Sequence, residues 1–103
     1  MTGDRAVFST LQFAMVICRN PETGAFLAVN ETKGRGWSIP GGSVNYGETF
    51  RAAAVRECLE ESDVEVTLKG VLLVSHQQFE SDYSAVTRVY FYAEPKNPTV
   101  VPK

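Results

Sequence analysis

The chain alternates apolar stretches with short polar turns, a pattern typical of a strand-rich domain. Thr10–Cys18 (TLQFAMVIC) is β-branched and apolar enough to predict a strand covered on both faces. Arg19–Gly24 (RNPETG) then predicts a turn, because its proline and glycine interrupt regular structure. Ala25–Val29 follows as a partner strand. These three stretches together predict a β-hairpin near the start of the chain.

A polar loop and a short extended piece come next. The loop, Asn30–Gly36, carries two basic side chains, Lys33 and Arg35. Trp37–Ile39 predicts a brief extended segment that Pro40 stops, because proline removes a backbone donor. Two glycines follow and let the backbone approach a bound group closely, although a simple tight turn would also need them.

The second half of the chain predicts one long bent strand and its return. Val64–Leu68 alternates apolar and polar residues, Gly70 allows a bulge, and Val71–Ser75 continues as an apolar strand. Glu80–Ser84 predicts a polar turn. Ala85–Ala93 (AVTRVYFYA) is the strongest strand signal in the sequence, rich in β-branched and aromatic residues. The only histidine of the chain, His76, is expected to be a residue of the bent strand.

The stretch between these halves predicts one helix. Thr49 can cap its first turn through the hydroxyl group. Glu57, Glu60 and Glu61 then stand at positions i, i+3 and i+4, so the three carboxylates share one face. At about 100° per residue, an apolar set falls on the other side and is expected to dock on the core: Ala52, Val55, Cys58 and Leu59.

Three neighbouring carboxylates repel one another, and a divalent cation removes that penalty. Oxygen-only ligands favour Mg²⁺, Mn²⁺ or Ca²⁺. The same spacing also suits an ordinary solvated helix face, on which Arg56 and Glu60 form an i, i+4 ion pair. The glutamates alone leave both interpretations open.

Length and composition limit the chain to one small domain. Its 103 residues, 44% of them hydrophobic, can bury a single core, and helix plus strands indicate the α+β class with a mixed sheet. A net charge of −2 gives no general attraction for nucleic acid backbones, so we expect no duplex partner. The absence of a long apolar run predicts no membrane partner and a cytoplasmic location. Cys18 and Cys58 lack metal-site spacing and are expected to be reduced core residues.

The glutamates belong to a longer pattern of spaced residues that indicates one interpretation over the other. The sequence fits G-x5-E-x7-R-E-U-x-E-E-x-G-U, where U is an aliphatic residue, and the stretch Gly42 to Val64 resembles the Nudix box of the Nudix hydrolases. The two departures are Asp63, where the family usually has glycine, and Cys58, a small apolar residue in an aliphatic position. Aspartate adopts the left-handed conformation more readily than most residues, so we expect the helix to end there. The residues in register are Gly42, Glu48, Arg56, Glu57, Cys58, Glu60, Glu61 and Val64.

The resemblance implies a fold, a reaction and a set of roles. The fold would be the Nudix α/β/α sandwich, and the activity hydrolysis of a diphosphate linked to another moiety, with Mg²⁺ or Mn²⁺ as cofactor. Arg56, Glu57 and Glu60 are the catalytic candidates: Arg56 would fix the carboxylates, and one glutamate would orient or deprotonate the water. The implied metal ligands are Gly41 through its carbonyl, Glu57, Glu60, Glu61 and, directly or indirectly, Glu48.

The substrate class follows less directly. The resemblance favours a small-molecule nucleotide, namely a nucleoside triphosphate or a dinucleoside polyphosphate. Lys33 and Arg35 are the candidates for holding the phosphates, and Trp37 and Tyr46 for holding the base. The alternative is a non-catalytic nucleotide-binding or interaction module on the same scaffold, which usually has lost box carboxylates. This chain retains all four box glutamates, and this favours an enzyme.

The length raises one further expectation. Nudix domains commonly continue past the strand matched by Ala85–Ala93 with another strand and a second helix, whereas this chain offers only residues 94–103. We therefore expect a single domain over residues 1–103 that lacks the C-terminal helix, and one sheet face left uncovered. Either self-association to a homo-oligomer or a longer natural protein would cover that face.

Overall fold

The computed structural model describes residues 9–31 and 36–103. The first strand, the helix and the last two strands follow the predicted order, whereas Gly41–Ser43 forms a strand that was not predicted. A single 3₁₀ turn, Glu80–Asp82, joins the last two strands. Along the chain the elements are β1 (Ser9–Cys18), β2 (Val29–Glu31), β3 (Gly36–Ser38), β4 (Gly41–Ser43), α1 (Phe50–Ser62), β5 (Val66–Phe79) and β6 (Ser84–Pro95).

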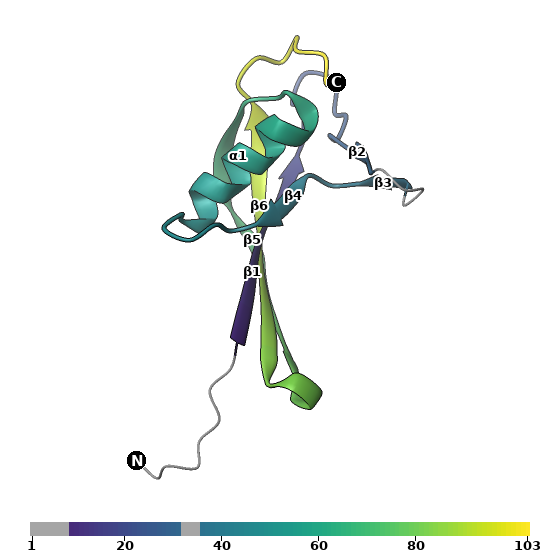
Figure 1. Cartoon of the computed structure of the whole chain (residues 1–103). Helices are drawn as coiled ribbons and strands as arrows, with labels where there is room; N and C mark the ends of the chain where they lie inside the picture. The colour runs from purple at the N-terminus through teal and green to yellow at the C-terminus, as the bar shows by residue number, and fades with distance from the viewer. Residues whose placement is uncertain (1–8, 32–35) are drawn as a thin grey trace.

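The strands form a mixed four-stranded sheet and a separate pair. The sheet order is β4-β1-β6-β5, with β1 parallel to β6 and the other neighbours antiparallel, while β2 pairs only with β3 in the described chain. The helix α1 lies across one face of the sheet (Figure 1). This arrangement is an α+β fold with a mixed sheet, as predicted, and α1 is the one α-helix of the described residues. No helix in those residues has the length and apolarity needed to cross a membrane.

The core lies between α1 and the two central strands. Val16 of β1 stands beside Phe91 of β6, and both are almost fully buried. Ala53, Ala54 and Cys58 of α1 complete this cluster at 0% exposure. Cys58 and Cys18 are both free thiols in buried positions, as expected.

The long strand β5 is bent where glycine was expected to allow it. Its register with β6 shifts between Leu68 and Gly70, and again between Val71 and Leu73. The turn that returns to β6 ends at Tyr83, whose φ of 52° is left-handed. The bulge, the turn and the final strand predicted from the sequence are therefore confirmed.

Two predictions for the first half of the chain are wrong. Ala25–Val29 is not a partner strand of β1: it makes one isolated bridge, Arg19 with Phe26, and one bond from the Leu27 N–H to the Cys18 carbonyl (2.9 Å). The reason is that β4 and β6 are already hydrogen-bonded to the two sides of β1, so Val29 pairs with β3 instead. Strand β1 was also predicted to be covered on both faces. A helix covers only one of them, because no helix of the described chain lies on the other face.

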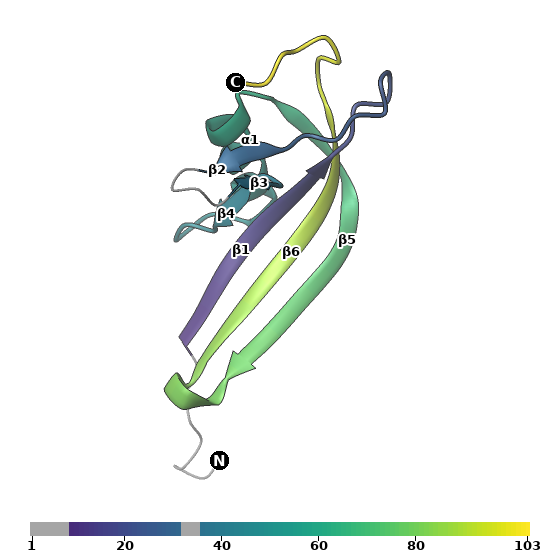
Figure 2. The same ribbon diagram turned by 90° about the vertical axis from the view of Figure 1, so that its right-hand side faces the viewer.

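The sheet extends well beyond the helix (Figure 2). The molecule measures 57 × 31 × 22 Å, and its radius of gyration of 16.0 Å exceeds the value of about 13 Å typical of a compact chain of this length. We call residues 71–87 of the β5–β6 hairpin the arm; its inner end, Val71–Val74, pairs with Val89–Phe91 of β6. Its strand β5 exposes four consecutive apolar side chains, Val71–Val74, at 55–59%. Apolar side chains are thus uncovered along this edge strand.

Candidate active site

Both ends of α1 are fixed by the residues that the sequence indicated. Thr49 has extended backbone angles, and its hydroxyl accepts a hydrogen bond from the Ala52 N–H at 3.0 Å. At the other end Asp63 adopts the left-handed conformation, with φ 62°, and its N–H donates to the Leu59 carbonyl at 2.8 Å. The aspartate therefore takes the place of the usual glycine in stopping the helix.

The buried face of α1 differs from the predicted one. Ala52 is exposed and Leu59 is 40% exposed, whereas Ala53 and Ala54 are fully buried. The helix docks through its smallest side chains, because they allow its backbone to lie close to the sheet. This rotates the buried face toward the glutamates, so the side chain of Glu57 is only 16% exposed.

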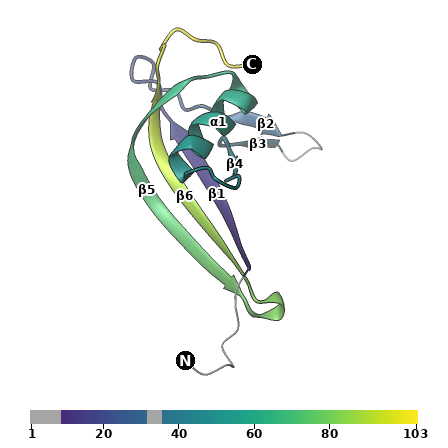
Figure 3. The same ribbon diagram turned by 60° about the vertical axis from the view of Figure 1, so that its left-hand side comes forward.

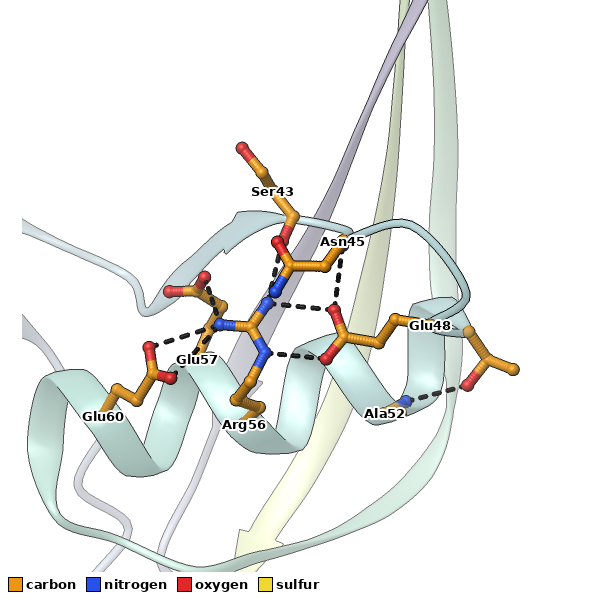
Figure 4. A network of polar contacts seen from close by, with 8 residues as sticks. Ser43, Asn45, Glu48, Ala52, Arg56, Glu57 and Glu60 are labelled. Carbon is orange, nitrogen blue, oxygen red and sulfur yellow. Dashed lines mark hydrogen bonds and ion pairs between the residues drawn. The ribbon is translucent and has the colours of Figure 1, made fainter.

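Arg56 is the centre of the site, because every N–H-bearing nitrogen of its guanidinium group has an acceptor (Figure 4). Nε and Nη2 donate to the two carboxylate oxygens of Glu48, at 2.7 and 3.0 Å. Nη1 donates to Glu57 at 2.9 Å and to Glu60 at 3.2 Å, and Nη2 also donates to the Ser43 carbonyl at 3.0 Å. One cation thus holds three carboxylates in a fixed arrangement.

The Arg56–Glu48 pair carries the strongest electrostatic interaction of the site. The fork of hydrogen bonds from Arg56, together with the Asn45 N–H at 2.9 Å, lowers the pKa of the Glu48 carboxyl to about 2. Glu48, followed by Glu57 and Glu60, raises the pKa of Arg56 above its already high value. Both groups therefore remain charged over any physiological range of pH.

The two glycines before the helix are needed because the backbone passes close to its neighbours. A Cβ atom on Gly42 would lie 2.5 Å from Cδ of Glu57, and one on Gly41 would lie 2.6 Å from Sδ of Met15. Both glycines belong to β4 and pair with β1, so they form an edge strand and not a tight turn. The Gly41 N–H, turned away from β1, donates to Glu61 at 2.9 Å.

The structure brings together most of the predicted residues and separates the rest. Glu48, Arg56, Glu57 and Glu60 form one network, and Glu61 is attached to Gly41 beside it. Trp37 is 72% exposed on β3, and Tyr46 is fully exposed on the loop before α1. Lys33 and Arg35 lie outside the described residues. No sequence signal points to the Ser43 carbonyl, because any residue can supply a backbone acceptor.

The donor atoms fit a hard divalent cation in chemistry, but they are not assembled around one. No three acids, histidines or cysteines of the described ranges form a ready-made metal site. Arg56 holds Glu57 and Glu60 instead, and both carboxylates reach its Nη1 within 3.3 Å. Oε2 of Glu57 has no partner among the described residues. The cluster therefore supplies the carboxylate oxygens that Mg²⁺ and Mn²⁺ prefer, with the guanidinium group of Arg56 at its centre.

The fold and the site together define a class of protein: a small mixed-sheet domain that holds a glutamate-rich helix against a glycine strand. A model of the NUDIX domain matches residues 10–103, which is almost the whole chain. The chain belongs to the NUDIX domain family.

Solved structures of the same fold agree with this assignment. The NUDIX hydrolase of Nitrosomonas europaea superposes with a TM-score of 0.68 at 20% identity, over 86% of this chain and 61% of that one. The MutT protein of Methanosarcina mazei Go1 gives 0.64 at 22% identity, over 85% and 65%. The C. elegans Ap4A hydrolase gives 0.65 at 24% identity, over 90% and 74%. The chain thus spans about two thirds of the length of these proteins.

Proposed function

We propose that the chain acts as a single domain that hydrolyses a diphosphate linkage in a nucleoside diphosphate derivative, with Mg²⁺ or Mn²⁺ as cofactor. The observation that carries this proposal is the arrangement of Glu48, Glu57 and Glu60 around Arg56, with Glu61 of the same helix accepting a hydrogen bond from Gly41 of β4. A solvated helix face would need no part-buried arginine fork and no glycine at position 42. The network supports an organised site more than a chance cluster of acids.

Each residue has a role that follows from its contacts. Glu57, Glu60 and Glu61 would hold the metal, with the Gly41 carbonyl and Glu48 as further or supporting donors. The bound metal supplies positive charge that stabilises the phosphoryl oxygens during the attack of water. Oε2 of Glu57 is open to accept a proton from that water, as Oε1 is held by Arg56. Arg56 is a positioning residue, because its donors are already engaged.

The favoured substrate is a nucleoside triphosphate or a dinucleoside polyphosphate. Among proteins of this fold are a MutT protein, an Ap4A hydrolase and a UDP-X diphosphatase, so the fold accommodates several nucleotide substrates. Trp37 and Tyr46 supply exposed aromatic rings on which a base can stack. Lys33 and Arg35 remain the proposed phosphate contacts.

A nucleotide panel tests the reaction and names the substrate. Phosphate and pyrophosphate release would be measured over nucleoside triphosphates, dinucleoside polyphosphates and nucleotide sugars, with Mg²⁺, with Mn²⁺ and with excess EDTA. We expect release from at least one class with metal and none with EDTA. Activity that survives EDTA would contradict the proposal.

The competing function is a nucleotide-binding module without turnover. Nothing in the described site favours it, since all four glutamates are present and three of them are joined through Arg56. Thermal stabilisation by a nucleotide, without any release of phosphate or pyrophosphate, would identify the chain as such a module.

A further inference from the structure

A second cleft lies along the first turns of α1 on the side of β5, and Arg56 is the one residue that it shares with the proposed active site. It is shallow and open to solvent, with a volume of about 660 Å³. Its walls are the first turns of α1 and the beginning of β5. Strand β5 forms one edge of the sheet (Figure 3). The lining residues are Arg51, Ala52, Val55, Arg56, Val66, Thr67, Leu68 and Lys96.

The order of the sheet separates this cleft from the glutamates. Gly42 and Gly41, which approach Glu57 and Glu61, belong to β4 at one edge of the sheet. The cleft is built against β5 at the opposite edge. A molecule in the cleft would therefore contact α1 from the β5 side, where Arg56 is the one lining residue that also belongs to the glutamate network.

The lining of the cleft is positively charged. It contains three cationic residues and no acidic one. Arg56 is neutralised by its three carboxylates, but Arg51 and Lys96 have no side-chain partner within residues 9–31 and 36–103. Arg51 also stands in the first turn of α1, where the helix dipole disfavours a cation and where no acidic residue compensates it. Two cations are thus left to attract an anion.

The floor of the cleft is apolar. Val66 is 2% exposed, and Val55 and Leu68 are half-buried, so only parts of these side chains reach the cleft. A free inorganic anion would gain nothing from such a floor. A ligand with an apolar body would cover it and gain about 25 cal/mol for each Å² of apolar surface removed from water.

We propose that this cleft binds an organic monophosphate, with the phosphate on Arg51 and Lys96 and the apolar body on the half-buried Val55 and Leu68. Two unpaired cations match the charge of about −2 that a phosphate monoester carries at neutral pH. Arginine also suits phosphate geometry, because it can donate two parallel hydrogen bonds. The site has Arg56 in common with the proposed active site, but the donors of Arg56 are engaged by carboxylates, and binding at Arg51 and Lys96 requires no metal.

Phenyl phosphate is a suitable probe, because it joins one phosphate to one apolar ring. Its binding would be measured by isothermal titration calorimetry in excess EDTA at low salt, beside inorganic phosphate and phenol. We expect saturable binding of phenyl phosphate, and binding at least about tenfold weaker for each of the two fragments. Affinity should fall as salt is raised, because an exposed ion pair is screened.

Charge-reversal variants locate the binding. The double variant Arg51→Glu/Lys96→Glu should lose at least about tenfold in affinity, since two charge-assisted contacts are replaced by repulsion. The single variants Arg51→Ala and Lys96→Ala should each lose less affinity for phenyl phosphate than the double variant. Lys103→Glu is a control for altered charge outside the cleft. Glu61→Gln should bind phenyl phosphate like the wild type, which separates this site from the proposed reaction.

Two results would overturn the proposal. One is the absence of saturable binding of phenyl phosphate to the wild-type chain. The other is unchanged affinity in both alanine variants, whose exposed positions leave the fold intact, as circular dichroism would confirm.

Discussion

The part of the sheet beneath α1 and the arm are built from the same strands, yet their burial is opposite. Phe91 of β6 is 2% exposed, whereas Leu73 and Val74 of β5 are 56% and 59% exposed. Val71 pairs directly with Phe91 and is still 55% exposed, because the helix covers the central strand and not the edge. The position of the helix therefore decides which apolar residues form the core.

The covered part also holds the polar site. The Arg56 network lies on α1 and on the loop that leads from β4, whereas the arm offers isolated polar contacts, such as His76 with the Thr87 hydroxyl at 3.0 Å. We therefore expect substitutions beneath or on α1 to have large effects and matched substitutions on the arm to have small ones.

The largest effect is expected in the core. Phe91→Ala should reduce the free energy of unfolding by about 3–5 kcal/mol, because it removes a fully buried ring and leaves a cavity. The matched variant Leu73→Ala on the arm should cost less than about 1 kcal/mol, because its side chain is mostly in water already. Urea unfolding of both variants would measure the difference. Similar losses would mean that the arm is buried in solution.

The next effect concerns turnover. Glu61→Gln should lower kcat/KM at least about 100-fold, or about 2.7 kcal/mol, because it removes a proposed metal ligand without removing a core contact. Glu80→Gln, which makes the same chemical change on the arm, should leave activity unchanged. A Glu61→Gln variant with full activity would exclude this residue from the site.

A third prediction concerns the apolar surface of the arm. Four consecutive exposed apolar side chains on an edge strand favour pairing with a second copy of the chain. Light scattering should show a mass that increases with concentration, and Leu73→Glu should return it to that of a monomer. Activity per chain should not change in the variant. A wild-type mass that stays monomeric at high concentration would show that the arm tolerates exposure.

A smaller effect is expected at the end of α1. Asp63 has a positive φ, which glycine adopts without strain. Asp63→Gly should therefore stabilise the chain by about 0.5–1 kcal/mol, whereas Asp63→Ala should destabilise it. Thermal unfolding would rank the stability of the wild type and the two variants. If Asp63→Ala were the most stable of the three, the backbone at position 63 would not be strained.

The smallest effect is the pH dependence of Glu48, which lies near solvent. Its pKa is about 2 in the folded chain, against an ordinary value of 4.5 for a glutamate in water, so the unfolded chain binds the proton first as the pH falls. The stabilisation is therefore present above about pH 4.5 and is lost as the pH falls toward about 2. Between pH 6 and pH 3, the urea midpoint should fall more for the wild type than for Glu48→Gln. Equal falls would mean that Arg56 does not hold this carboxylate in solution.

The sequence by itself determined the elements whose cause is local. Thr49 and Asp63 bound the helix because capping depends on single residues and their backbone angles. Gly70 marked the bulge, and the β-branched run after Ser84 marked the final strand. The spacing of Arg56 and the glutamates indicated the site and the family, because positions three and four apart must share a helix face.

Only the tertiary structure decided what depends on neighbours from elsewhere in the chain. The partner of β1 is β6, a strand about 75 residues later, and no local pattern reveals such a pairing. The helix docks through Ala53 and Ala54, because its backbone can lie close to the sheet only where the side chains between them are small. Arg56 meets Ser43 and Glu48 for the same reason: the packing of α1 against the sheet brings distant groups within hydrogen-bonding distance, and that packing is set by the whole core.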